Sequence, residues 1–277
     1  MRICSSVVEL RAALHGSAHP IGFVPTMGAL HDGHVALLDR ARAECAVVVA
    51  SIFVNPKQFG EAADLERYPR TPDEDAQIVR DAGCDILFRP TEAEMYPPGA
   101  EFTVQPGKVA EGYEGAFRPG HFEGVCLVVC KLFHLVRPDR AYFGTKDAQQ
   151  IAVVRAMVRD LDFGIDVVGV ETVRASDGLA LSSRNRRLSD AGRTKALALH
   201  AGLQRANAAF RAGERDPVTL AEIASTPGTD YEYCACVDPV TFAAPQSGYL
   251  VILAATVDGV RLIDSLALTE GESSRLE

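Results

Sequence analysis

The sequence lacks long apolar runs and lacks an excess of positive charge. None of its hydrophobic stretches approaches the roughly 18 residues of a membrane-spanning helix, so we expect no membrane partner. There are 28 lysines and arginines against 37 aspartates and glutamates, and the formal net charge at pH 7 is −9. This acidic balance argues against a general nucleic-acid-binding surface, although a local basic pocket is compatible with it.

A secretory signal and a disulfide framework are also missing. The first residues, MRICSSVVEL, contain one arginine followed by polar and acidic side chains, which is not the pattern of a signal peptide. The seven cysteines are an odd number and lie mainly within apolar runs, as is typical of reduced, buried thiols. We therefore expect a cytoplasmic protein.

The familiar sequence motifs for nucleotides and metals are absent as well. Neither the Walker A pattern nor a GxGxxG after a predicted strand occurs. Cys126 and Cys130 lie four apart in a predicted helix, and Cys234 and Cys236 alternate in a predicted strand, but no second pair at ligand spacing accompanies them. We interpret these cysteines as packing residues, and any nucleotide site must be of another type.

What the chain does contain is the pattern of a folded α/β protein. Its 277 residues suit one large or two modest domains, and 47% hydrophobic residues can form a core. Short β-branched runs alternate with amphipathic helical stretches over the first 170 residues. The predicted strands are 21–24, 46–54, 85–88, 141–143 and 165–170, and the predicted helices are 34–45, 73–83, 125–136 and 147–160. This alternation predicts a Rossmann-like parallel sheet with helices on both faces, which binds ligands at the carboxyl ends of its strands.

The sequence changes character near residues 171–188, which are polar and arginine-rich. A long alanine-rich helix is predicted at about 189–212, followed by a loop containing DP, TP and PG, and then by strands near YEYCACV, YLVILAATV and VRLID. We predict a first domain over residues 1–172 and a smaller C-terminal α/β domain over 173–277 that closes over the active site. The tail after Leu268 is expected to be frayed.

The stretch PTMGALHDGH, residues 25–34, places two histidines around a glycine between a predicted strand and a predicted helix. A metal site, a nucleotide site and an ordinary turn all compete to explain it. Catalytic zinc usually needs three protein ligands, and His31 and His34 supply two. Gly33 would let a flat ring or a phosphate approach the backbone, and helix N-terminal amides attract anions. From this stretch alone, a phosphate-facing cradle and a plain turn are equally open.

Three further segments combine basic and polar side chains at predicted loops or at the junction of a strand and a helix. They are FRPGHFEGV (117–125), FGTKDAQQ (143–150) and SSRNRRL (182–188). A single lysine or arginine is normally a solvated surface residue. Several of them at separate loop positions in an acidic protein favour a polyanion such as ATP.

The sequence resembles the pantothenate synthetase (pantoate–β-alanine ligase) family in six segments that occur in the family's order: PTMGALHDGH, SIFVNPKQF (51–59), YPRTP (68–72), RPGHFEGV (118–125), FGTKDAQQ (143–150) and DGLALSSRNRRL (177–188). The resemblance is strong over about residues 20–190 and weaker beyond. HDGH is similar to the HxGH signature of nucleotidylyltransferases, and SSRN stands where that superfamily often carries a lysine-rich KMSKS loop. The resemblance implies that ATP, with Mg²⁺, activates pantoate as pantoyl adenylate, and that β-alanine then displaces AMP to give pantothenate, the coenzyme A precursor. It also implies a homodimer and no tightly bound organic cofactor.

The resemblance also implies roles for individual residues. The residues that it implies bind ATP are Met27, Gly28, Ala29, Leu30, His31, Asp32, Gly33, His34, Gly144, Thr145, Lys146, Asp147, Val173, Leu181, Ser182, Ser183 and Arg184. The catalytic residues among these are His34, a proton donor, with His31, Lys146, Ser182, Ser183 and Arg184. The residues implied to bind pantoate are Gln58 and Gln150. Those implied to bind β-alanine are Gln58, Tyr68 and Arg184.

The sequence departs from the family pattern at several positions. Thr145 and Ala148 stand where relatives often have glutamate and an aromatic residue. Glu74 and Asp75 match only in charge an acidic pair that is credited with magnesium binding, so we assign no protein metal ligand. Asn55, a candidate pocket residue, and Tyr68 also have plain structural explanations, as a turn residue and a packing residue.

Three other functions stay open beside the ligase. Another HxGH nucleotidyltransferase would leave Gln58 and Gln150 without a role. A non-catalytic nucleotide sensor could use the same fold, although the two histidines and Lys146 disfavour it. A metal-dependent hydrolase is the third alternative.

Overall fold

The computed structural model describes residues 1–60 and 62–270, so most of the tail expected to be frayed lies outside the described residues. The chain divides into two compact units. The N-terminal unit comprises Met1–Gly144 and Val153–Glu171, and the C-terminal unit comprises Thr145–Ala152 and Thr172–Glu277.

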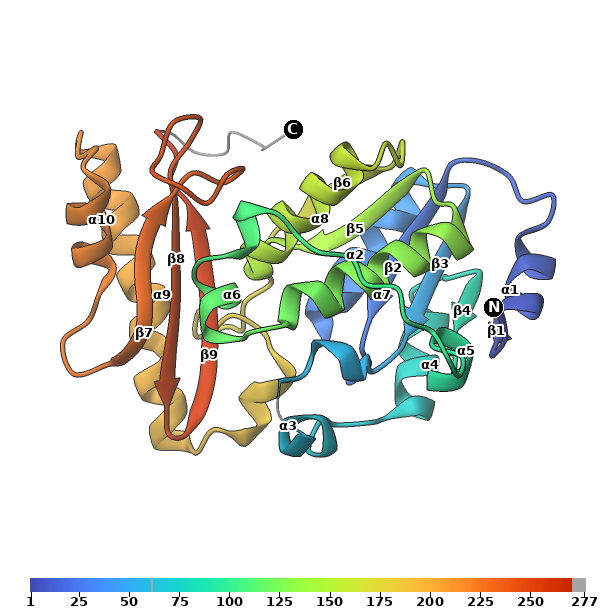
Figure 1. Cartoon of the computed structure of the whole chain (residues 1–277). Coiled ribbons are helices and arrows are strands. Elements are labelled where there is room, and N and C mark those ends of the chain that lie inside the picture. Colours follow the sequence, from blue (N-terminus) through green and yellow to red (C-terminus); the bar gives the residue numbers. More distant parts are fainter. Residues whose placement is uncertain (61, 271–277) are drawn as a thin grey trace. The chain divides into compact units, whose positions relative to one another are not determined.

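The N-terminal unit is built on a six-stranded sheet in which the paired strands are all parallel (Figure 1). The strand order is β1-β4-β3-β2-β5-β6. The strands are β1 (Arg2–Cys4), β2 (Ile21–Thr26), β3 (Val47–Ile52), β4 (Ile86–Phe88), β5 (Arg140–Gly144) and β6 (Asp166–Val170). The five predicted strands are therefore confirmed, and β1 is an addition.

Helices cover both faces of this sheet, as predicted. The longer ones are α1 (Val7–Leu14), α2 (Asp32–Glu44), α4 (Pro72–Asp81), α7 (His121–Val136) and α8 (Ala148–Asp160), which begins in the C-terminal unit. Short helices are η1 (Pro56–Gln58), α3 (Ala62–Glu66), α5 (Glu92–Met95), η2 (Lys108–Ala110), α6 (Glu114–Phe117) and η3 (Thr145–Asp147).

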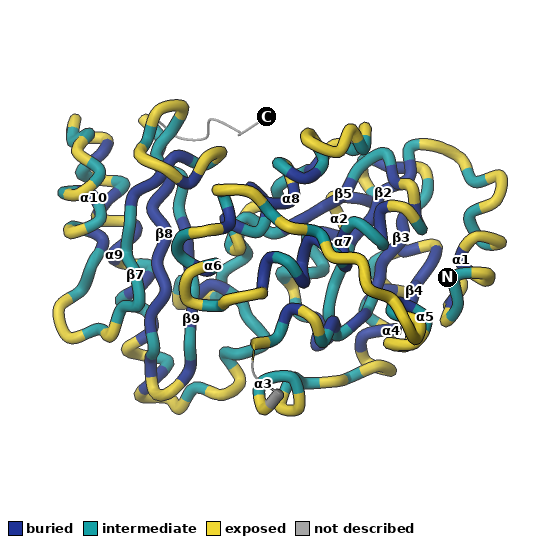
Figure 2. The backbone as a smooth tube through the Cα atoms, in the orientation of Figure 1, coloured by how far each residue is buried: buried dark blue, intermediate teal, exposed yellow. Residues whose placement is uncertain are grey.

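The two faces can be read from adjacent residues of β2. Val24 packs in one buried cluster with Leu37 and Leu38 of α2. Phe23 points to the opposite face, where its ring lies 6.3 Å from that of Phe133 on α7. Alternation along a strand produces this division, and Figure 2 shows the inner strands β2, β3 and β5 as largely buried.

Several predicted boundaries were wrong by a few residues, and several short elements were not predicted. The helix predicted at 34–45 begins at Asp32, the one predicted at 125–136 begins at His121, and the one predicted at 147–160 is the turn η3 followed by α8. The elements that were not predicted include β1, which has only three residues, and α1, whose N-terminus has a capping box between Ser6 and Glu9.

The C-terminal unit contains a three-stranded antiparallel sheet against which the helices α9 (Asp190–Arg211) and α10 (Pro217–Ala224) pack. The strands β7 (Asp230–Val237), β8 (Leu250–Val257) and β9 (Val260–Ala267) pair in chain order. The helices pack with them in a buried cluster that includes Leu203, Leu220 and Leu253. The short helix η4 (Ser183–Arg187) precedes α9.

Helix α10 corrects the prediction of a loop after the alanine-rich helix. Asp216 caps it by accepting a hydrogen bond from Thr219 N–H at 2.8 Å, and Pro217 occupies its first turn. Leu220 is completely buried, so packing stabilises a helix that is too short to stand alone.

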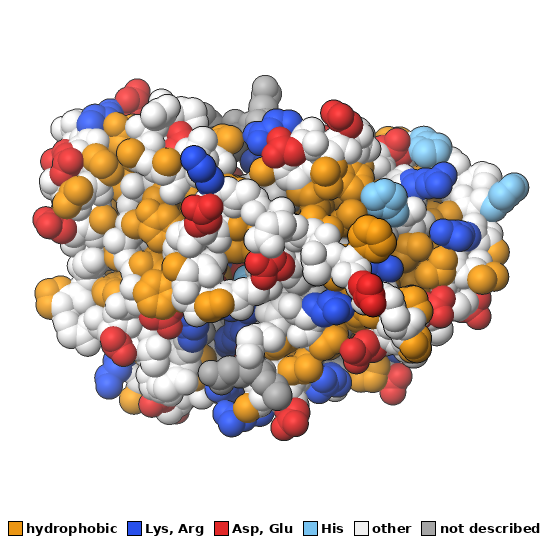
Figure 3. All heavy atoms as spheres, viewed as in Figure 1, with side chains coloured by type: hydrophobic (Ala, Val, Ile, Leu, Met, Phe, Trp, Pro, Cys, Tyr) orange, Lys and Arg blue, Asp and Glu red, His pale blue; other side chains and the backbone are white. Residues whose placement is uncertain are grey.

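On the face drawn in Figure 3, basic side chains are interspersed among acidic ones. Within residues 1–60 and 62–270, none of the helices combines the length and the apolar character that crossing a membrane requires.

Candidate active site

The two histidines of HDGH cap the N-terminus of α2, next to the carboxyl end of β2. Gly33 N–H donates to Nδ1 of His31 at 3.1 Å, and His31 N–H donates to Nδ1 of His34 at 3.3 Å. The ring centroids are 4.2 Å apart and the planes are tilted by 48°. The turn that caps the helix is therefore observed, and a role of the two imidazoles toward a phosphate stays a prediction.

This capping geometry fixes which nitrogen of each ring can donate. Because Nδ1 of both rings accepts a backbone N–H, the neutral imidazoles carry their proton on Nε2. An Nε2–H group is a suitable donor to a phosphate oxygen. A Cβ at Gly33 would lie 2.9 Å from Cε1 of His31, so the missing side chain makes room for that ring. The expected approach of a phosphate to the backbone of Gly33 stays a prediction.

The side chain of Gln58 is buried and held from both ends. Its Nε2 donates to Sδ of Met27 at 3.1 Å, and its Oε1 accepts from Nδ2 of Asn55 at 3.0 Å. Asn55 is itself fixed, because its Oδ1 accepts from Lys57 N–H at 3.3 Å and from the hydroxyl of Tyr96 at 2.9 Å. Asn55 therefore serves the turn at η1 and also orients the amide of Gln58.

The segment RPGHFEGV supports the backbone of Gln58. His121 is buried, and its Nδ1–H donates to the carbonyl oxygen of Gln58 at 3.0 Å. Arg118 donates to Nε2 of His121 at 3.2 Å and to Glu114 at 3.4 Å. Sequence reasoning counted Arg118 and His121 among groups for a polyanion, whereas these contacts join them to Gln58.

Tyr68 packs against Phe59, with ring centroids 5.7 Å apart in an edge-to-face arrangement. This contact matches the packing explanation of Tyr68 and leaves its predicted role toward β-alanine as a prediction.

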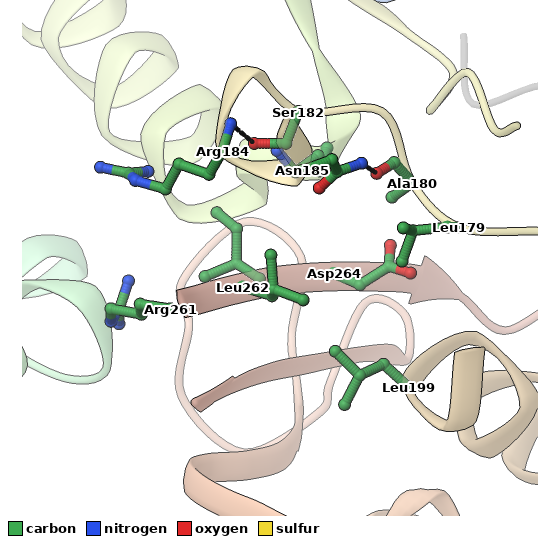
Figure 4. Close-up of a pocket in the computed structure, with 11 residues that line it drawn as sticks. Leu179, Ala180, Ser182, Arg184, Asn185, Leu199, Arg261, Leu262 and Asp264 are labelled. Carbon is green, nitrogen blue, oxygen red and sulfur yellow. Dashed lines mark hydrogen bonds between the residues drawn. The ribbon is translucent and has the colours of Figure 1, made fainter. Parts of the chain in front are cut away.

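In the C-terminal unit, a pocket brings together several residues predicted for ATP (Figure 4). Its polar lining includes Lys146, Ser182, Arg184, Arg261 and Asp264. Ser182 caps η4, since its Oγ accepts from Arg184 N–H at 3.3 Å. Figure 4 shows Leu262 and Asp264 on β9, across from the turn that carries Ser182 and Arg184.

Side chains of strand β9 form hydrogen bonds with two other segments of this unit, one at Arg174 and one at Thr145. Arg174 forms a two-bond ion pair with the buried Asp264, at 2.7 and 3.0 Å, and donates to the carbonyl of Gly178 at 3.3 Å. Ser265 donates from Oγ to the carbonyl oxygen of Thr145 at 2.9 Å. This hydrogen bond uses the backbone of Thr145, so it does not depend on the Thr145 side chain, which departs from the family pattern.

The predicted site residues fall into two groups, one in each unit. Residues 27–34, Gln58, Tyr68 and Gly144 lie in the N-terminal unit. Residues 145–147, Gln150, Val173 and 181–184 lie in the C-terminal unit.

Sequence reasoning missed four residues that hold these groups in place: Asn55 as an orienting residue, Asp75, His121 as a support, and Asp264. One signal was available for Asp75, because it shares the apolar face of α4 with Ala76 and Val79. A carboxylate at such a position needs internal hydrogen-bond donors.

The acidic pair after YPRTP does not fit a magnesium site. Both oxygens of Asp75 accept backbone N–H groups, at 3.0 Å from Ala29 and 2.8 Å from Leu30, and Glu74 is exposed. In the part of the chain that the structure describes, no cluster of three or more His, Cys, Asp or Glu side chains could hold a metal ion.

The N-terminal unit has a parallel sheet covered by helices, and a histidine-capped helix begins at the carboxyl end of one strand. The C-terminal unit has a pocket lined by cationic side chains. These features define an α/β protein with candidate nucleotide-binding groups. The chain belongs to the pantoate-beta-alanine ligase family, whose model matches residues 2–267.

Named relatives and solved structures agree with this family. Pantothenate synthetase 1 of Bradyrhizobium diazoefficiens is 48% identical, with 97% of this chain and 99% of that protein covered. Pantothenate synthetase of Gluconobacter oxydans is 47% identical, with 97% and 100% covered. The structure of pantothenate synthetase from Thermus thermophilus matches with a TM-score of 0.90 and 46% identity, over 97% of this chain and 99% of that one. The Francisella tularensis ligase, solved with beta-gamma ATP and beta-alanine, matches with a TM-score of 0.83 and 32% identity, over 99% and 100%.

Proposed function

We propose that this chain catalyses the reaction for which its family is named, the ATP-dependent joining of pantoate and β-alanine to give pantothenate. The observation that carries the proposal is the family match over residues 2–267. The imidazole cap on α2 and the cationic pocket of the C-terminal unit supply the kinds of groups that the chemistry needs.

In the first half-reaction, a carboxylate oxygen of pantoate attacks the α-phosphorus of ATP. The bond from this phosphorus to the bridging oxygen breaks, and pyrophosphate leaves with the electron pair. No nucleophile from the protein is required, so the enzyme must orient the reactants and offset negative charge. We assign ATP contacts to residues 27–34, 144–147, 173 and 181–184. His34 donates from Nε2 to a phosphate oxygen, and His31, Lys146, Ser182, Ser183 and Arg184 assist it.

In the second half-reaction, the amine of β-alanine attacks the acyl carbon of pantoyl adenylate. The bond from this carbon to the phosphate oxygen breaks, AMP leaves, and the amine loses a proton as the amide forms. We assign pantoate to Gln58 and Gln150, because an amide both donates and accepts. Arg184, Gln58 and Tyr68 are assigned to β-alanine, with Arg184 holding its carboxylate.

The proposal extends to the setting of the reaction. ATP enters as its magnesium complex, with no metal ligand assigned to the protein and no tightly bound organic cofactor. The first domain, residues 1–172, binds nucleotide and pantoate, and residues 173–277 close during the reaction. We also propose a homodimer in the cytoplasm. The seven free cysteines suit a reducing compartment. Sedimentation and cell fractionation test these two points.

The decisive experiment is pyrophosphate exchange. With ATP and magnesium, we expect pantoate-dependent incorporation of labelled pyrophosphate into ATP in the absence of β-alanine. Addition of β-alanine should then yield pantothenate and AMP, measured by mass spectrometry. Exchange that proceeds equally well without pantoate, or not at all, would contradict the adenylate and favour another nucleotidyltransferase or a sensor.

A further inference from the structure

Asp75 is a buried carboxylate, and it is not among the residues that we propose to contact a substrate. It lies in the first turn of α4, and only 1% of its surface is exposed. Its oxygens accept hydrogen bonds from the backbone N–H groups of Ala29 and Leu30, which precede it by 46 and 45 residues. Asp75 therefore reaches from α4 to the loop that leads into HDGH.

The loop that Asp75 holds has an uncommon backbone conformation. Gly28 and Ala29 have φ values of +86° and +51°, both in the left-handed region. This region is unfavourable for a residue with a side chain such as Ala29. A Cβ at position 28 would lie 2.9 Å from Oδ2 of Asp75, so the glycine lets the loop approach the carboxylate. The two charge-assisted hydrogen bonds stabilise a conformation that the local sequence disfavours.

We propose that Asp75 is a positioning residue for the ATP-binding loop, residues 27–34, and not a magnesium ligand. The inference rests on the proposed function in one respect, the binding of ATP by this loop. Two N–H dipoles point their positive ends at the carboxylate oxygens, and burial excludes the waters that Mg²⁺ retains. Held in this way, the loop is ordered before ATP arrives, so binding does not have to order it.

The test compares Asp75→Asn with two matched controls. The asparagine amide turns an NH₂ group toward one of the backbone N–H groups and removes the charge. In pyrophosphate exchange, we expect the KM for ATP to rise at least about tenfold and the KM for pantoate to change less than about threefold. Asp73→Asn and Glu74→Gln remove one charge from the same helical turn at exposed positions, and both should behave like the wild type.

A second comparison asks whether the variant acts through the loop. Glycine adopts φ near +51° without the cost that alanine has, so Ala29→Gly in the Asp75→Asn background should recover part of the affinity for ATP. No recovery would count against positioning. If Asp75→Asn lowers the Tm and leaves the KM for ATP unchanged, the residue is structural only and the proposal is wrong. If Glu74→Gln is equally damaging and both variants need more magnesium, the acidic pair is a metal site and the proposal is also wrong.

One measurement depends on neither activity nor a folded variant. In the wild type without ligands, amide hydrogen exchange at Ala29 and Leu30 should be slow, because both N–H groups are bonded to a buried carboxylate. Rapid exchange at these two amides would overturn the proposal. The wild-type protein could show slow amide hydrogen exchange at Ala29 and Leu30 and yet no pantoate-dependent incorporation of pyrophosphate into ATP. In that case only the proposed function would fail.

Discussion

At the scale of single residues, polar side chains around the candidate site are held in fixed orientations by hydrogen bonds to other parts of the protein. His31 and His34 accept backbone N–H groups through Nδ1, which sets the proton on Nε2. Gln58 is oriented by Asn55 at its amide and by His121 at its backbone carbonyl. Groups held in this way need little reorganisation when a charged substrate binds.

The first prediction concerns His34. If its Nε2–H stabilises the charge that moves to the leaving pyrophosphate, His34→Ala should slow adenylation by about 10²-fold or more. The cap to His31 is lost as well, which costs about 1 kcal/mol, so the protein should still fold.

Single-turnover formation of pyrophosphate and thermal unfolding measure the two effects of His34→Ala separately. His15→Ala, at an exposed position, is the control. A protein with nearly normal adenylation and a much lower Tm would show that His34 is only a helix cap.

At the scale of elements, the pocket of the C-terminal unit depends on strand β9. Asp264 and Ser265 are adjacent, and each holds a different segment, one through Arg174 and the other through Thr145. The turn η4 then places Arg184 on the pocket lining, while Arg186 and Arg187 are exposed.

The second prediction follows from this difference among the arginines. Arg184→Ala should reduce the overall ligation about ten- to a hundredfold, the effect of losing a good hydrogen bond to a charged group. Arg184→Lys should recover little, because lysine lacks the planar fork that binds phosphate or carboxylate through two bonds. The double variant Arg186→Ala/Arg187→Ala should matter much less. Steady-state rates decide the question, and equal activity in all three proteins would make η4 a charged surface turn.

At the scale of the whole molecule, each unit has its own hydrophobic cluster, and buried polar residues stabilise the loops between elements. Asp238, which is 1% exposed, accepts hydrogen bonds from the backbone of Val240, Thr241, Gln246 and Ser247. Burial alone would raise the pKa of Asp238, but the hydrogen bonds from Ser247 and Thr241 outweigh it and hold the pKa well below its ordinary value.

The third prediction concerns acid stability. Because the pKa of Asp238 is lowered on folding, its stabilisation is fully present above the ordinary pKa of about 4 and is lost as the pH falls below it. Asp238→Asn should therefore lower the Tm at pH 7 by at least about 2 °C, and the difference from the wild type should shrink toward pH 3. Asp230→Asn, at an exposed position of the same unit, is the control. A Tm difference that does not depend on pH would contradict the role of the charge.

Local sequence patterns were enough to predict the parallel α/β class, five of the six strands in the N-terminal sheet, the helices on both of its faces and the family. These follow from local periodicity and from motifs of several residues, which persist whatever the rest of the chain does. Short elements such as β1 and α10 were not predicted, because three to eight residues carry too little periodic signal.

Long-range contacts, in contrast, establish which side chains hold the candidate site in place, and these contacts exist only in the folded chain. Asp75 meets Ala29 and Leu30 across about 45 residues, His121 meets Gln58 across 63, and Arg174 meets Asp264 across 90. A buried polar group must find a partner, but its sequence does not say where along the chain that partner is. The pairing is fixed when helices and strands pack, because only then do distant backbone and side-chain groups come within hydrogen-bond distance in a place that water does not reach.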